Sequence, residues 1–130
     1  MPNNQFKKPV LVVGSLILLV IIIFVGLMLS GKKSDAKLDD FTKCLKNKGV
    51  IFYGAFWCPH CQDQKALFGS SQKYLPYVEC STPDAKGQLP ICQEKNIAGY
   101  PTWVFADGKQ QSGSLDLNTL AKESGCSLLQ

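Results

Sequence analysis

Apolar residues are spaced differently in the first and second parts of the chain. Residues 10–29, VLVVGSLILLVIIIFVGLML, contain no charged side chain. A helix of this length spans about 30 Å, which is the hydrocarbon thickness of a bilayer. The run therefore predicts a transmembrane signal-anchor helix over residues 9–30, with residues 1–8 as a cytoplasmic tail.

A cleaved secretory signal peptide is the alternative interpretation of this run, because Lys7 and Lys8 precede it. The apolar core of such a peptide is typically about 7–15 residues long and leads to a cleavage site with small residues. Here the apolar run is longer, and Leu29-Ser30-Gly31-Lys32 lacks a convincing pair of small residues. The pattern favours the uncleaved anchor, and both interpretations send the rest of the chain to the same side of a membrane.

The remaining residues predict a linker followed by one folded domain. Residues 31–40 are small and charged without periodicity, which is typical of a linker. From residue 41 onward the apolar spacing predicts alternating helices and strands. The expected elements are a helix at 41–45, a strand at 50–56, a helix at 59–68, a strand at 77–80, a helix near 91–95, a strand at 102–105, a hairpin turn at Asp107-Gly108, a strand at 110–113 and a helix from Leu117 that Gly125 closes. This order predicts an α/β domain over residues 41–130, with a mixed sheet and helices on both faces.

Charge excludes one class of function. Residues 1–37 carry five lysines and one aspartate, which account for the whole formal net charge of +4. The predicted domain is therefore neutral, and the chain contains no arginine. Because nucleic-acid binding normally needs a basic patch with arginine or lysine contacts, it is a poor interpretation of this sequence.

The cysteines suggest on which side of a membrane the domain lies. Lysines do not decide the orientation, since Lys7 and Lys8 precede the apolar run while Lys32, Lys33 and Lys37 follow it. Six cysteines in one small domain is dense usage, and disulfides persist outside the reducing cytosol. We therefore predict a single-pass membrane protein whose domain is extracytoplasmic, in the periplasm or at the cell surface.

The candidate chemistry lies in Trp57-Cys58-Pro59-His60-Cys61. A helix that begins at Pro59 places Cys58 at a helix N-terminus, where free N–H groups and the helix dipole favour a thiolate. Cys61 lies about one helical turn further on and can attack a mixed disulfide at Cys58. His60 can add a proton-dependent positive charge, and stabilising the thiolate makes the disulfide a stronger oxidant. The motif predicts a redox-active pair that Pro59 and His60 tune and that needs no bound cofactor.

Half of a structural zinc site is the alternative interpretation of the two cysteines. Such a site usually needs a second pair of ligands at close spacing. Cys80 and Cys92 are twelve positions apart, and His60 is the single histidine of the chain. We therefore predict no metal site.

These residues resemble the thioredoxin superfamily, through the Cys58–Cys61 motif after a buried strand and Gly99-Tyr100-Pro101-Thr102 further on. Residues 52–65, 77–80 and 99–103 are similar to the thioredoxin-like domain fused to or paired with bacterial vitamin K epoxide reductase homologues. The resemblance covers residues 41–130. It implies a thioredoxin fold, a cis peptide at Tyr100-Pro101 and electron exchange with a quinone-reducing membrane partner.

The resemblance also implies a substrate groove. In this geometry Pro101 lies beside Cys58, and the Tyr100 backbone pairs with an extended substrate segment. Trp57 and Tyr100 then form an apolar rim suited to secreted or unfolded proteins that carry thiols. Trp103 is better interpreted as a core residue.

One position departs from the family pattern. Thioredoxins carry a buried acidic residue six positions before the first active cysteine, where this chain has Phe52. The group that accepts the proton of Cys61 is thus open, with water and His60 as the candidates.

Four cysteines remain once Cys58 and Cys61 are set aside, and they allow three pairings. Cys80 and Cys92 flank the polar loop at residues 81–88, and the resembling domains carry cysteines at both places. We predict a structural disulfide between them. Cys44 and Cys126 then pair by elimination, and two free buried thiols are the alternative for these two residues.

Together these features predict a membrane-anchored thiol–disulfide oxidoreductase. It is expected to oxidise secreted proteins through Cys58 and to be reoxidised by a quinone-linked membrane protein similar to vitamin K epoxide reductase. Two alternatives stay open: an extracytoplasmic disulfide reductase of the same fold, and a non-catalytic module that binds client proteins.

Overall fold

The computed structural model describes residues 7–29 and 36–128, with side chains described over residues 13–26 and 36–128. The chain separates into two compact units, Met1–Lys33 and Ser34–Gln130. The predicted tail at residues 1–8 and the first half of the predicted linker at residues 31–40 lie largely outside the described residues.

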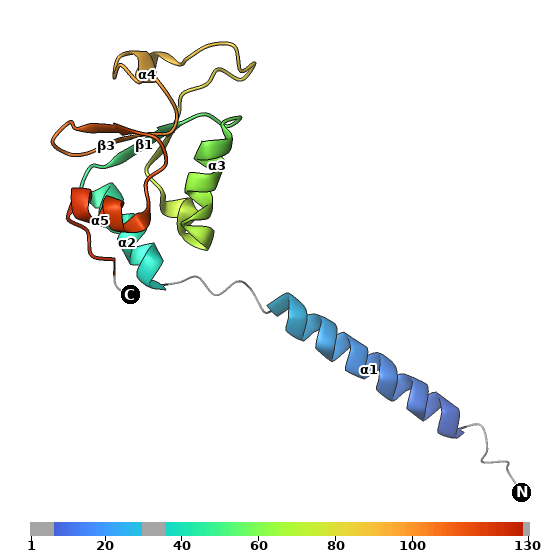
Figure 1. Ribbon diagram of the computed structural model, residues 1–130. Helices are drawn as coiled ribbons and strands as arrows, with labels where there is room; N and C mark the ends of the chain where they lie inside the picture. The colour runs from blue at the N-terminus through green and yellow to red at the C-terminus, as the bar shows by residue number, and fades with distance from the viewer. Residues whose placement is uncertain (1–6, 30–35, 129–130) are drawn as a thin grey trace, which may run out of the picture. The chain divides into compact units, whose positions relative to one another are not determined.

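The first unit contains the helix α1, Lys7–Leu29 (Figure 1). Its described side chains are exposed, and most of them are large and apolar. Of the residues that the structure describes, none form a helix that is both long and apolar enough to cross a membrane. The helix α1 coincides with most of residues 9–30, where the sequence predicts a membrane anchor.

The second unit is an α/β domain whose elements follow the predicted order. Its elements are α2 (Ala36–Asn47), β1 (Ile51–Gly54), α3 (Pro59–Ala66), the 3₁₀ helix η1 (Gly69–Tyr74), β2 (Tyr77–Glu79), α4 (Pro90–Gln93), β3 (Thr102–Val104), β4 (Gln110–Ser112) and α5 (Leu117–Ser124). The helix η1 was not predicted from the sequence, and every strand is shorter than predicted. The strand β1 ends early because the backbone turns after Gly54, where the Cys58 N–H donates a hydrogen bond to the Ala55 carbonyl.

The four strands form a mixed sheet, as predicted, and their order in the sheet is β2-β1-β3-β4. The strand β1 pairs with β2 in parallel and with β3 antiparallel, and β3 pairs antiparallel with β4. Phe52 of β1 therefore lies between Tyr77 of β2 and Trp103 of β3. Because β1 is central, the strand that leads to Cys58 is hydrogen-bonded along both of its edges.

Helices cover both faces of the sheet, although unequally (Figure 1). On one face Phe52 and Trp103 stack with ring centroids 4.7 Å apart, and α2, α3 and α5 pack there. On the other face a smaller cluster around Tyr53 packs against Cys92 of α4 and Ile97. Trp103 is fully buried, which confirms its interpretation as a core residue.

The helix α2 begins earlier than predicted. Residues 36–40 were expected to belong to the linker, but they form the start of this helix. Leu38, Phe41 and Leu45 lie on one helical face and pack into the same core cluster. Asp39 is buried and accepts a hydrogen bond from the Ser71 hydroxyl of η1. The charged residues at 36–40 therefore belong to the start of α2, and the apolar face of this helix begins at Leu38.

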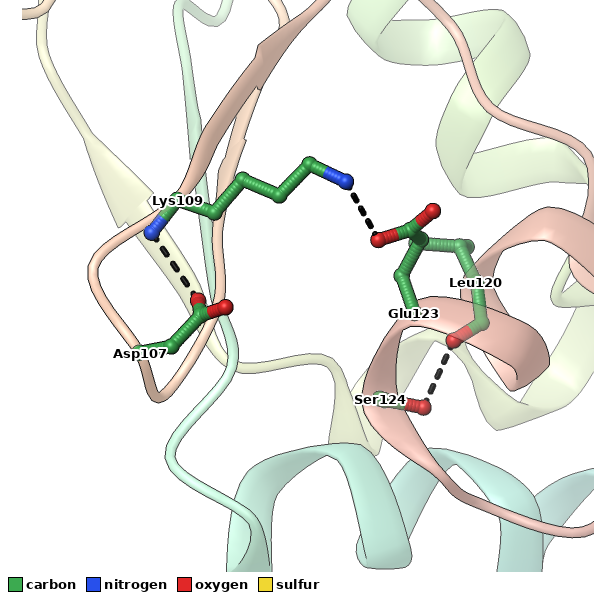
Figure 2. Close-up of polar contacts among 5 residues, drawn as sticks. All are labelled: Asp107, Lys109, Leu120, Glu123 and Ser124. Atoms are coloured by element: carbon green, nitrogen blue, oxygen red, sulfur yellow. Dashed lines mark hydrogen bonds and ion pairs between the residues drawn. The ribbon is translucent and has the colours of Figure 1, made fainter.

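The predicted hairpin turn at Asp107-Gly108 is confirmed, and Figure 2 shows how it connects to α5. The Asp107 carboxylate accepts a hydrogen bond from the Lys109 N–H, and Gly108 has a φ of 82°. The Lys109 ammonium group lies 2.6 Å from the Glu123 carboxylate on α5. Gly125 follows α5 in the left-handed conformation, as expected for a residue that ends a helix.

Two disulfides join distant elements. Cys44 of α2 pairs with Cys126, which follows α5, and Cys80 at the end of β2 pairs with Cys92 of α4. These are the two pairings predicted from the sequence. Cys58 and Cys61 are the free cysteines of the chain.

Candidate active site

Cys58 occupies the N-cap position of α3. Its backbone is extended, with φ −79° and ψ 117°, and Pro59 begins the helix. The Cys58 carbonyl accepts hydrogen bonds from the N–H groups of Cys61 at 3.1 Å and Gln62 at 3.2 Å. Cys58 therefore lies at the positive end of the helix dipole, as its spacing from Pro59 predicts.

The two thiols differ in their access to solvent. The Cys58 side chain is 5% exposed, and its sulfur lies 3.7 Å from the Tyr100 carbonyl oxygen. Cys61 is completely buried in the core cluster that α3 contributes to. Of the two thiols, Cys58 is therefore the one closer to solvent.

Burial also separates the two thiols chemically. It raises the pKa of the Cys61 thiol to about 12, and the hydrogen bond with Cys58 raises this pKa as well. The backbone hydrogen bond with Ala55 and, to a smaller extent, the positive charge of Lys65 act in the opposite direction and lower this pKa. At neutral pH the Cys61 thiol of the reduced protein is therefore protonated.

We expect iodoacetamide to modify Cys58 of the reduced native protein at pH 7 while Cys61 stays unmodified. A pKa of about 12 in place of 9 reduces the thiolate fraction of Cys61 about a thousandfold, and its burial slows reaction further. Peptide mass spectrometry measures both rates, and the denatured protein, in which both thiols are exposed, is the control. Equal rates at the two cysteines in the native protein contradict this assignment.

The predicted groove residues lie beside Cys58. The Trp57 side chain is 50% exposed, its indole N–H donates to the Ser81 hydroxyl at 2.8 Å, and its ring meets Tyr100 edge-on at 6.1 Å. The Tyr100-Pro101 peptide is cis, as the resemblance implies, and Pro101 is buried. The structure thus brings Trp57, Tyr100 and Pro101 together beside Cys58.

A comparison with protein families decides the relationship. The family model described as thioredoxin matches residues 32–123. The chain belongs to the thioredoxin family. This agrees with the mixed sheet and with the strand, turn and helix that present Cys58.

Two curated relatives are similar to this thioredoxin-family chain. The thiol-disulfide oxidoreductase LTO1 of Arabidopsis thaliana is 46% identical over 93 residues, which cover 68% of this chain and 24% of that protein. The thioredoxin domain-containing protein 5 homolog of Drosophila melanogaster is 38% identical over 99 residues, covering 69% of this chain and 24% of that protein. The chain thus spans about a quarter of the length of each relative.

No buried carboxylate occupies residue 52 to accept the proton of Cys61, for which water and His60 are the candidates. Phe52 is buried and stacked on Trp103, so the usual acidic position of the thioredoxin family is apolar here. His60 lies on the first turn of α3 with an exposed side chain.

In the described parts of the chain, no group of three or more histidine, cysteine or acidic side chains is placed to hold a metal ion.

Sequence reasoning missed an acidic group beside the turn after β1. The Glu79 carboxylate accepts hydrogen bonds from the N–H groups of Phe56 at 3.2 Å and Ser81 at 2.9 Å, and from the Tyr77 hydroxyl at 2.6 Å. Burial and this carboxylate raise the pKa of Tyr77, so its hydroxyl stays protonated. Glu79 follows Tyr77 by two residues on a predicted strand, and this same-face spacing is the signal that could have identified the pair.

Phe56 was also missed as a site residue. The apolar run at residues 50–56 predicts a strand buried on both faces, but Phe56 follows β1 in the turn and is 48% exposed. Its carbonyl accepts a hydrogen bond from the Gln62 side chain of α3. The turn before Cys58 thus carries two exposed aromatic side chains, Phe56 and Trp57.

Proposed function

We propose that this chain is a thiol–disulfide oxidoreductase that reacts through Cys58 and Cys61. One observation carries the proposal: these two thiols are free and adjacent at a helix N-terminus, while the other four cysteines are paired in disulfides. Membership of the thioredoxin family supports it, as does similarity to a relative that is named a thiol-disulfide oxidoreductase.

The reaction is an exchange of disulfide bonds. In the oxidising direction a substrate thiolate attacks the Cys58 sulfur, the Cys58–Cys61 bond breaks, and Cys61 leaves as a thiolate that takes up a proton. A second substrate thiolate then attacks the substrate sulfur of the mixed disulfide and releases Cys58. The substrate loses two electrons and gains a disulfide, and the Cys58/Cys61 pair receives both electrons.

We propose oxidation of secreted proteins as the physiological direction. The two structural disulfides support an oxidising compartment, because such bonds are rare in proteins of the reducing cytosol. The position of Cys58 at the N-terminus of α3 supports it as well, since the positive end of a helix dipole favours a nearby negative charge. The exposed rings of Trp57 and Phe56 suit an unfolded protein segment as the substrate.

The partner and the location are also part of this proposal. A quinone-linked membrane oxidoreductase of the vitamin K epoxide reductase type is proposed to reoxidise the pair. Membrane attachment with an extracytoplasmic domain rests on the uncharged run at residues 10–29 and on the cysteine content. Alkaline carbonate extraction of cell membranes tests the attachment, and release of the full chain into the soluble fraction contradicts it.

The reduction potential of the Cys58/Cys61 pair, measured against glutathione buffers, tests the direction. Thioredoxin-like reductants lie near about −270 mV and strong periplasmic oxidants near about −120 mV. We expect a value near the oxidant end, and alkylation trapping in cells should find the pair mainly as a disulfide. A low potential with a reduced pair in cells favours the reductase, and a wild-type protein without exchange activity favours the non-catalytic client-binding module.

A further inference from the structure

Three side chains from two elements form a connected group next to Cys61. Lys65 lies four residues after Cys61 on α3, so both side chains occupy the same helical face. The Lys65 ammonium nitrogen lies 3.5 Å from the centre of the Tyr77 ring on β2. The Tyr77 hydroxyl donates to the Glu79 carboxylate at 2.6 Å. The ring of Tyr77 thereby holds a cation on the helix that carries both active-site cysteines.

Gly54 allows the Tyr77 ring and the Cys61 sulfur to approach each other. A Cβ atom at Gly54 would lie 2.9 Å from Tyr77 Cε2 and 3.0 Å from Cys61 Sγ. Both atoms therefore adjoin one backbone position, and a larger residue there would push them away. The cation over the ring is thus kept near the sulfur and half-buried, where an electrostatic interaction is screened less than at the surface.

We propose that Lys65, held over the Tyr77 ring, stabilises the Cys61 thiolate that forms when the Cys58–Cys61 disulfide opens. This role rests on the proposed exchange function. Lys65 acts on the charge of the sulfur and forms no bond, and Tyr77 is a positioning residue for its ammonium group. Lys65 thereby takes part of the function that a buried proton acceptor would have at the apolar Phe52 position.

The need for such a cation follows from the burial of Cys61. A buried sulfur is a poor leaving group and a poor attacking thiol, because both steps pass through its thiolate. Burial raises the pKa of Cys61, while the backbone hydrogen bond with Ala55 and the charge of Lys65 lower it. A nearby opposite charge favours the ionised form of an acid, so a cation beside Cys61 raises the thiolate fraction that is available for exchange at neutral pH.

The other titratable groups around Cys61 do not replace this charge. Cys58 faces it from the start of α3 and carries a negative charge once it is a thiolate. From β2, Tyr77 is neutral, and the Glu79 carboxylate is bound to the Tyr77 hydroxyl and to two backbone N–H groups. The strand β1 presents no titratable side chain to this face, and the other titratable side chains of α3 are exposed. Lys65 is therefore the cation that faces Cys61 within the described residues.

The test separates the two steps of exchange. Reduced full-length protein is mixed with oxidised glutathione. Stopped-flow fluorescence and acid-quench mass spectrometry then follow two rates. The measurements cover pH 6–10, a range of about four units that includes the ordinary thiol pKa. The first rate reports attack by Cys58 and the second reports resolution of the mixed disulfide by Cys61. Lys65→Gln should slow resolution about tenfold at pH 7 and move its pH profile upward by about one unit. Attack by Cys58 should change much less.

Three control variants make the result specific. Lys65→Arg keeps a cation that can stack on the ring and should restore the resolution rate. Lys46→Gln removes an exposed lysine of α2 and should leave both rates unchanged. Tyr77→Phe keeps the ring but removes the hydroxyl, and it should resolve within about twofold of the wild-type rate if the ring alone holds the cation.

Several outcomes overturn the role of Lys65. In Lys65→Gln, an unchanged resolution rate and pH profile, or equal slowing of both steps, would contradict it. Failure of Lys65→Arg to restore the rate would contradict it as well. So would a loss of resolution rate in Tyr77→Phe as large as in Lys65→Gln. The last result would assign the effect to the Tyr77–Glu79 hydrogen bond. A wild-type protein that releases no glutathione from Cys58 instead contradicts the proposed function itself, so the two failures are distinguishable.

Discussion

Replacement of Cys61 by alanine is expected to stop turnover and to accumulate mixed disulfides through Cys58. Cys58 carries the sulfur that substrates can reach, and Cys61 is buried one turn away as the resolving thiol. Without Cys61 the intermediate must wait for an external thiol, and loss of such an intramolecular step should cost at least about a hundredfold in rate. Insulin reduction measures the turnover, and non-reducing gels with mass spectrometry identify the trapped species.

Cys58→Ser is the matched control for the trap. It should lose turnover as well, but it should form no mixed disulfide, because the remaining thiol of Cys61 is buried. In cells the Cys61→Ala variant should trap both secreted proteins and a membrane protein with several spans. Mixed disulfides that form through Cys61 as readily in Cys58→Ser would mean that the roles of the two cysteines are reversed.

Removal of Cys44 and Cys126 together should produce the largest loss of stability among the cysteine variants. Their disulfide closes a loop with a sequence separation of 82 residues and ties α2 to the segment after α5. On the loop-entropy model such a bond contributes about 4–5 kcal/mol, a large share of the roughly 5–15 kcal/mol that stabilises a typical domain. Urea unfolding of the Cys44→Ala, Cys126→Ala double variant measures the change in the free energy of unfolding.

The second disulfide is the internal comparison for this prediction. Cys80 and Cys92 close a loop with a separation of 12 residues, so their joint replacement by alanine should cost about 3 kcal/mol. Both double variants should keep exchange activity at temperatures where they remain folded, because neither disulfide includes Cys58 or Cys61. Loss of turnover without loss of stability in the Cys80, Cys92 variant would instead identify a second shuttle pair.

The order of elements could be predicted because it depends on local patterns. Three such patterns each act within a few residues of their own position: the continuous apolar run before Cys58, Pro59 at the start of α3, and Gly125 after the end of α5. The starts and ends of elements depend on more distant contacts. Residues 36–40 have no clear apolar pattern, yet Leu38 packs on the core and Asp39 binds Ser71 of η1. Such contacts appear only once the chain is folded.

The candidate site could be predicted in part, because its two cysteines belong to a local pattern while its other residues come from distant segments. Cys58 and Cys61 belong to one motif, and the resemblance to thioredoxins added Tyr100 and Pro101 from a distant segment. Lys65 could not be assigned a role from the sequence, because its partner on β2 is set by the register of that strand against β1. A four-residue spacing on one helix is common and predicts no particular charge effect by itself.

Stoichiometric transfer of a disulfide is the most direct test of the central claim. The oxidised full-length protein is incubated with an excess of a reduced, unfolded protein, and thiol-specific labelling with mass spectrometry then locates every thiol in both molecules. The exchange mechanism predicts about one disulfide gained by the substrate for each molecule of this protein, with new thiols at Cys58 and Cys61 and intact Cys44–Cys126 and Cys80–Cys92 bonds. A Cys58–Cys61 disulfide that persists, or thiols that appear first at the other two bonds, would contradict it.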